Sequence, residues 1–81
     1  MRVTVRVFAR LRDIIGEGEF TRNVPSGASV REVWRALAAE YPEIARYESS
    51  VSSAVNADYA RLDAKVRDGD EVAFLPPVSG G

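Results

Sequence analysis

Apolar and polar residues alternate at the start of the chain, between Arg2 and Phe8. Val3, Val5 and Val7 are separated by polar side chains. A period of two is typical of a strand with one buried face, so we predict a strand over this segment. Phe8 falls on the polar parity and is therefore predicted to lie on the opposite face of the sheet from the valines.

A different period marks one main helix that begins after Ser29. Ser29 and Glu32 have the spacing of a capping box, in which each side chain bonds the backbone amide of the other residue. Pro42 is expected to end the helix, because proline disfavours helical geometry at the residue before it. Between these limits, apolar residues recur at spacings of three and four and predict one buried stripe that includes Trp34 as a core residue: Val30, Val33, Trp34, Leu37, Ala38 and Tyr41.

Short strands and turns account for the remaining segments. We expect a helical turn over 9–15 ended by Gly16, strands over 19–24 and 71–75, a short strand ending near Asn56, an edge strand over 59–62 and a further turn over 43–47. One helix must then cover one face of a small mixed sheet, which predicts an α+β fold of the ubiquitin-like β-grasp type. The predicted organisation is a β-grasp domain over 1–75 and an extended, flexible tail over 76–81 that begins with Pro76 and Pro77.

Composition limits the chemistry that the chain can perform. Its 81 residues are enough for one domain. The chain contains no cysteine and no histidine, which excludes disulfides, zinc sites built from those residues, and thiol or imidazole catalysis. We therefore expect a binding module or a carrier rather than a self-sufficient enzyme, with no metal or cofactor bound by this chain.

The charge balance bears on partners and location. Eleven basic and twelve acidic residues give a net charge of −1, which argues against nucleic-acid partners and anionic membranes. No apolar run approaches the ~20 residues that a membrane span needs. The alternating start of the chain is unlike a signal peptide. A cytoplasmic location is expected.

Two glycine-containing motifs are assigned to turns. Gly16-Glu17-Gly18 lacks the third glycine and the following helix of a phosphate-binding loop. Asp68-Gly69-Asp70 lacks the oxygen spacing and terminal glutamate of a calcium loop. A hairpin turn accounts for the second motif.

Two features point to function. Phe8 and Leu75 share the face opposite the predicted core, where two large apolar side chains suggest a partner-binding patch, although single exposed apolar residues are common. The chain also ends in Gly80-Gly81 after a stiff proline pair. Such an end is thin enough to enter a narrow channel, and its carboxylate can be activated as an acyl adenylate. The alternative is an ordinary frayed terminus.

Several runs of residues along the chain share one pattern: Phe8-Ala9-Arg10-Leu11-Arg12, Gly16, Val55-Asn56, Tyr59 and the unbroken run from Asp68 to Gly81. On these residues the whole chain resembles the MoaD-type sulfur carriers, the small subunits of molybdopterin synthase. Leu75 stands where family members often have an aromatic residue, and it keeps the contact apolar.

The resemblance implies a two-stage sulfur cycle. A ubiquitin-activating-type adenylyltransferase, using ATP and magnesium, would adenylate Gly81. A sulfurtransferase would then supply sulfur from a persulfide and leave a thiocarboxylate on Gly81. The Gly80-Gly81 end would enter the large synthase subunit and donate sulfur to cyclic pyranopterin monophosphate, which builds the dithiolene of molybdopterin.

The resemblance also implies the partner contacts. The apolar contacts shared by both enzymes would be Phe8, Tyr59 and Leu75, with the spacer residues Pro76, Pro77 and Val78 next to them. The assembly would be a heterotetramer of two large and two small subunits. The large subunit would supply the catalytic groups, so this chain would be its non-catalytic, sulfur-donating partner.

Three other functions remain open at the level of sequence. Carriers for thiamine or cysteine biosynthesis also end in Gly-Gly. A ubiquitin-like modifier would be conjugated to lysines through Gly81. An interaction module with a fortuitous end would bind as before after deletion of Gly81, whereas a carrier or modifier would lose its function.

Overall fold

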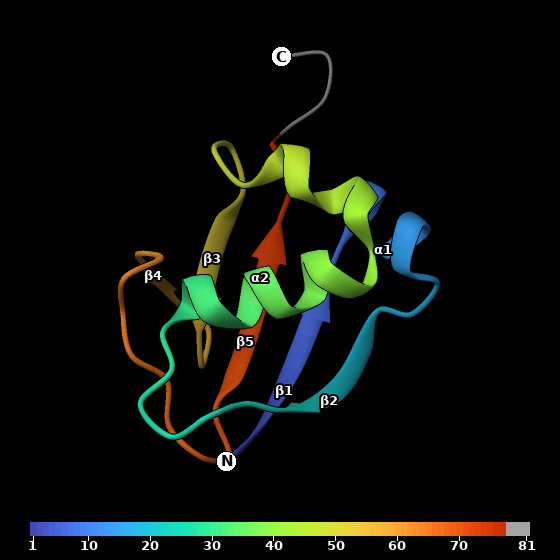
Figure 1. Cartoon of the computed structure of the whole chain (residues 1–81). Helices are drawn as coiled ribbons and strands as arrows, with labels where there is room; N and C mark the ends of the chain where they lie inside the picture. The colour runs from blue at the N-terminus through green and yellow to red at the C-terminus, as the bar shows by residue number, and fades with distance from the viewer. Residues whose placement is uncertain (78–81) are drawn as a thin grey trace.

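A mixed sheet forms the body of the molecule. In the computed structural model, which describes residues 1–77, five strands are arranged in the order β2-β1-β5-β3-β4 (Figure 1). β1 and β5 are parallel, and every other neighbouring pair is antiparallel. The strands are β1 (Arg2–Val7), β2 (Glu19–Asn23), β3 (Ser52–Val55), β4 (Asp58–Ala60) and β5 (Glu71–Leu75).

Three helical segments accompany the sheet. The main helix, α2 (Val30–Glu40), lies across one face of it (Figure 1). The short helix α1 (Ala9–Ile15) follows β1, and the 3-10 helix η1 (Pro42–Tyr47) follows α2. This two-layer arrangement confirms the predicted α+β class and the β-grasp architecture. Among the described residues, no helix is long and apolar enough to cross a membrane.

The core lies between α2 and one face of the sheet. The β1 valines are buried, and the register places Val5 beside Val72 and Val7 beside Phe74 on β5. Trp34 of α2 is fully buried and meets Phe74 edge-on, with the ring centroids 5.0 Å apart. The predicted parity of both strands and the core position of Trp34 are therefore confirmed.

The capping box of α2 is also confirmed. The Glu32 backbone amide donates to Ser29 Oγ at 3.3 Å, and the Ser29 amide donates to Glu32 Oε1 at 3.2 Å. These bonds satisfy amides that would otherwise lack partners at the start of the helix. The helix ends at Glu40, with Tyr41 as its C-cap directly before Pro42.

One turn interpretation is wrong. Asp68-Gly69-Asp70 does not form a hairpin, because β5 pairs with β1 and β3 and not with β4. The turn instead anchors the start of β1: Gly69 N donates to Arg2 O at 2.7 Å, and Arg2 N donates to Asp68 Oδ1 at 2.8 Å. Gly69 adopts a φ of 86°, which favours glycine.

Asp70 links this turn to the β3–β4 connection. Its carboxylate accepts from Asn56 Nδ2 at 2.9 Å and from Arg67 N at 2.8 Å. The bond from Asn56, followed by the bond from Arg67, holds the pKa of Asp70 below its ordinary value of 3.8. The ionised carboxylate thus fastens the loop before β5 to the turn between β3 and β4.

Candidate functional site

The face of the sheet opposite α2 carries a strip of apolar side chains. Strand register places Ala73 beside Ala54, and Ala54 beside Tyr59. Leu75 lies next along β5, opposite Ser52. Residues directly opposite one another in a sheet point to the same side, so these side chains share the outer face. Two alanines therefore form a low floor between the larger Tyr59 and Leu75.

Phe8 extends this outer face beyond the end of β1. The strand ends at Val7, one residue earlier than predicted, but Phe8 keeps an extended backbone as the N-cap of α1. The alternation of side chains therefore continues, and the Arg6 guanidinium lies 5.3 Å from the Phe8 ring centroid. Arg6 also pairs with Glu19 at 3.5 Å and with Glu71 at 3.4 Å, which holds it on this face.

A groove opens where β5 ends and the chain continues into Pro76 and Pro77. It has a volume of about 670 Å³. Four of the predicted partner-binding residues line it together, namely Phe8, Leu75, Pro76 and Pro77, and the other lining residues are Ala9, Arg10 and Tyr47. We call this feature the tail-base groove. Its walls come from four segments: the end of β1, α1, η1 and the end of β5.

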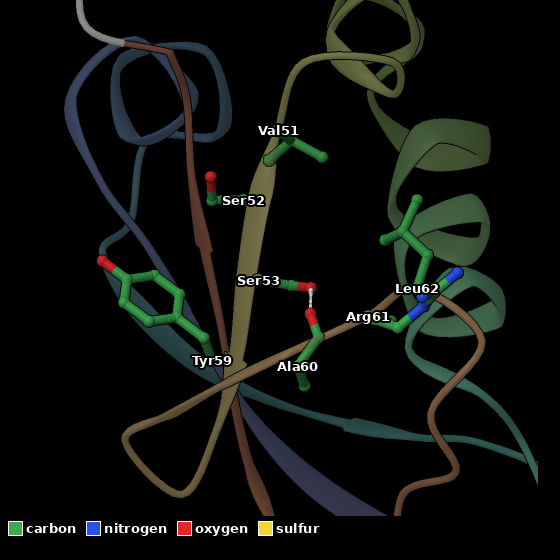
Figure 2. Close-up of a pocket in the computed structure, with 7 residues that line it drawn as sticks. All are labelled: Val51, Ser52, Ser53, Tyr59, Ala60, Arg61 and Leu62. Atoms are coloured by element: carbon green, nitrogen blue, oxygen red, sulfur yellow. Dashed lines mark hydrogen bonds between the residues drawn. The ribbon is translucent and has the colours of Figure 1, made fainter.

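Tyr59 lies apart from the tail-base groove. It is the most exposed large apolar residue of the described chain, at 84%, and it belongs to the edge strand β4. Figure 2 shows its ring beside Ser52, on the side of the sheet away from α2. A second cavity of about 330 Å³ adjoins it, and there Ser53 Oγ donates to Ala60 O at 2.7 Å.

Tyr47 and Arg10 of the groove were not predicted as site residues. The Arg46 guanidinium lies 5.2 Å from the Tyr47 ring centroid, and its Nη2 donates to Tyr47 Oη at 3.3 Å. The bond from Arg46, with further contributions from the charge of Arg46 and from Arg10, lowers the pKa of Tyr47. No local sequence signal joins Arg10 to Tyr47, because η1 meets α1 only in the folded chain.

Three predicted residues lie outside the described part of the chain. These are Val78, as a partner contact, and Gly80 and Gly81, as the chemically active end. Their assigned roles therefore remain predictions, as does the tail beyond Pro77. Within residues 1–77, no group of three or more acidic side chains could hold a metal ion.

Comparison with protein families gives a match over almost the whole chain. The ThiS family model matches residues 5–81. The molybdopterin synthase sulfur carrier subunit of Arabidopsis thaliana is 33% identical over 81 residues, which cover 100% of this chain and 84% of that protein. Small archaeal modifier protein 3 of Haloferax volcanii is 33% identical and is matched over 100% of both chains.

Solved structures share the fold. The crystal structure of SAMP1 from Haloferax volcanii has a TM-score of 0.87 at 27% identity, with 100% of both chains covered. A chain of the complex of subunits 1 and 2 of the molybdopterin-converting factor from Helicobacter pylori has a TM-score of 0.67 at 29% identity, again with 100% of both chains covered. The chain is thus similar to carrier subunits and to archaeal modifiers.

Proposed function

Because the chain belongs to the ThiS family, we propose that it is the sulfur carrier subunit of a molybdopterin synthase. The observation that carries the proposal is the tail-base groove. Phe8, Leu75, Pro76 and Pro77 meet where the folded domain passes into the segment that ends in Gly80-Gly81. A protein that binds this groove would hold the domain while the following residues reach its active site.

The chemistry of the cycle takes place at the Gly81 carboxylate. An adenylating enzyme transfers AMP from ATP to this carboxylate and releases pyrophosphate. The outer sulfur of a persulfide donor then attacks the acyl carbon and displaces AMP, which gives an acyl disulfide. A second thiol of the donor protein cleaves the S–S bond, which releases the thiocarboxylate and leaves a disulfide on the donor. In the synthase this sulfur passes to cyclic pyranopterin monophosphate. The chain has no histidine and no cysteine, so its partners must supply the acid–base and thiol groups.

The partners follow from the same proposal. A large synthase subunit would bind the outer face and the groove, and the likeness to a chain of a two-subunit molybdopterin-converting factor supports such a partner. A ubiquitin-activating-type adenylyltransferase and a sulfurtransferase would act before it. The synthase would contain two large and two small subunits. ATP and magnesium would be used by the adenylating partner and not held by this chain.

A second candidate is a ubiquitin-like modifier joined to protein lysines through Gly81. The likeness to small archaeal modifier protein 3 favours it, because that relative matches over its full length with the same identity as the plant carrier subunit. A carrier for thiamine or cysteine biosynthesis would use the same first stage. The candidates differ in the acceptor of the activated glycyl group, which is sulfide or thiol in a carrier and a lysine amine in a modifier.

Intact mass spectrometry tests the first stage. The chain is incubated with ATP, magnesium, a MoaD-type adenylating enzyme and sulfide. We expect a mass gain equal to replacement of one oxygen by one sulfur, located on Gly81 by fragmentation, and no gain in a chain that lacks Gly81. No gain, with the enzyme shown active on a known carrier, would contradict the proposal.

A second assay separates the carrier from the modifier. The charged chain is mixed with the large synthase subunit and cyclic pyranopterin monophosphate, and molybdopterin is measured. A synthase carrier yields product and returns to its starting mass. A modifier yields no product, but it forms adducts on lysines when a lysine-containing protein is present.

A further inference from the structure

The tail-base groove combines apolar surface with one lining arginine, Arg10, and a second arginine, Arg46, contacts its lining residue Tyr47. Phe8 and Leu75 supply apolar surface, while Arg10 lines the groove beside Tyr47. The Arg46 guanidinium lies 5.2 Å from the Tyr47 ring centroid, and its Nη2 is 3.3 Å from the hydroxyl. Two guanidinium groups, one from α1 and one from η1, therefore lie near a single half-buried tyrosine.

Neither of these arginines pairs with a carboxylate in the part of the chain that the structure describes. Four of the other eight arginines do so: Arg6, Arg22, Arg35 and Arg61 each have an acidic partner within 4 Å. The carboxylate that follows Tyr47 in the sequence belongs to Glu48, and Arg35 of α2 binds it at 3.3 Å. The groove thus has one positive charge in its lining and a second next to Tyr47, and neither has a counter-charge from residues 1–77.

We propose that Arg10, Arg46 and Tyr47 form a carboxylate-binding corner for the large synthase subunit. The occupant is a segment of that subunit with an acidic side chain next to an apolar one. The apolar side chain enters between Phe8 and Leu75, and the carboxylate lies between the two guanidinium groups. The inference rests on the proposed function and adds to it the chemistry by which the partner is selected.

Charge complementarity carries the choice of occupant. Two like charges near one tyrosine repel each other, and an anion placed between them removes that repulsion and accepts charge-assisted hydrogen bonds. A purely apolar segment would leave both guanidinium groups facing it without a partner, which is unfavourable at an interface. The lowered pKa of Tyr47 reports the same positive surroundings. The groove therefore selects for a negative charge beside an apolar group.

The test is a binding titration with the purified large subunit from the same organism. The main variant carries Arg10→Gln and Arg46→Gln together. A conservative variant carries Arg10→Lys and Arg46→Lys, which keep the charge. Arg61→Gln is the matched control, because Arg61 is exposed and pairs with Asp63 in the segment after β4, outside the groove. All three sites of substitution are exposed, and circular dichroism verifies the fold of each variant.

The dissociation constant is measured calorimetrically at low and at high salt. We expect the double glutamine variant to bind about tenfold more weakly at low salt and to lose most of the salt dependence. The lysine variant keeps both charges, so its dissociation constant should change with salt by more than half as much as that of the native chain. Arg61→Gln should bind as the native chain does. A double glutamine variant that binds within about twofold of the native chain, with the same salt dependence, overturns the inference.

Failure of the proposed function gives a different result. If the native chain gains sulfur on Gly81 and binds the large subunit, but the glutamine variant binds equally well, only the carboxylate-binding corner is refuted. If the native chain neither gains sulfur nor binds the large subunit, the proposed function is refuted and the corner with it.

Discussion

Replacing Phe74 by alanine tests whether β5 presents its even-numbered side chains to the core. Phe74 is fully buried and lies at the centre of the sheet, because β5 pairs with both β1 and β3. Its ring meets Trp34 at 5.0 Å in an edge-on arrangement. The substitution therefore removes a large apolar side chain from a position where the neighbouring strands cannot move inward to fill the space.

The expected loss is large relative to the stability of the domain. Truncation of a buried phenylalanine to alanine costs about 3–5 kcal/mol, which includes the cavity that it leaves. The lost ring pair with Trp34 accounts for about 0.5–1.5 kcal/mol of this amount. A domain of this length has a total free energy of unfolding of about 4–12 kcal/mol. Phe74→Ala should therefore remove at least a quarter of it, and at the lower end of the range it would unfold the domain.

Urea unfolding followed by the fluorescence of Trp34 measures the effect. Trp34 is the only tryptophan and is buried against Phe74, so its emission reports the packing of this core. With a slope of about 1.5 kcal/mol per molar urea, the midpoint should fall by about 2–3 M. Leu75→Ala is the matched control at the neighbouring, half-buried position on the opposite face, and its midpoint should fall by less than about 0.7 M. Equal losses in the two variants would refute the assignment of faces.

Three further predictions concern the partner face and two turns. Leu75→Asp should leave the fold intact and weaken binding of the large subunit by at least ~1–2 kcal/mol, measured by calorimetry; a variant that unfolds would contradict the outward position of Leu75. Ala57 has a φ of 73° in the β3–β4 turn, a region that glycine adopts without a steric penalty. Ala57→Gly should therefore raise the free energy of unfolding by about 0.5 kcal/mol, measured by urea unfolding. A lower urea midpoint than that of the native chain would count against this. Asp70 has a folded pKa below 3.8, so the stability that it contributes is present above that value and is lost as the pH falls through the folded pKa. Unfolding measured from about pH 5 to about pH 3 should therefore show a steeper loss for the native chain than for Asp70→Asn, and identical slopes would disprove the role of this carboxylate.

Local patterns were sufficient to predict the elements and their buried faces. The period of two in β1 and the capping box at Ser29 are each patterns of a few neighbouring residues, so the sequence alone is enough to detect them. The same parity placed Phe8 and Leu75 on the outer face, and the structure brings both residues to one groove. Their role in binding a partner stays a prediction.

Other features depend on contacts between distant segments. Asp68-Gly69-Asp70 has the composition of a hairpin turn, but the strand that follows pairs in parallel with β1. The residues around the turn do not indicate which strand β5 will pair with. Tyr47 joins the groove only because η1 meets α1 although 26 residues separate the two helices in the sequence. Tyr59 was expected only as a partner contact implied by the resemblance, and that role stays a prediction; its position outside the groove follows from the place of β4 at the sheet edge.

The central position of β5 has a consequence for how the chain is made. β5 is the last of the described strands to be synthesised, yet it separates β1 from β3 in the sheet. Before it is added, β1 and β3 each have an unpaired edge facing the other, and the core lacks Phe74. Contacts between the two ends of the sequence form slowly because a long loop must close first. A ribosome product that stops short of residue 71 lacks the strand that joins β1 to β3, so we expect interrupted chains to be cleaved by proteases more readily than finished ones.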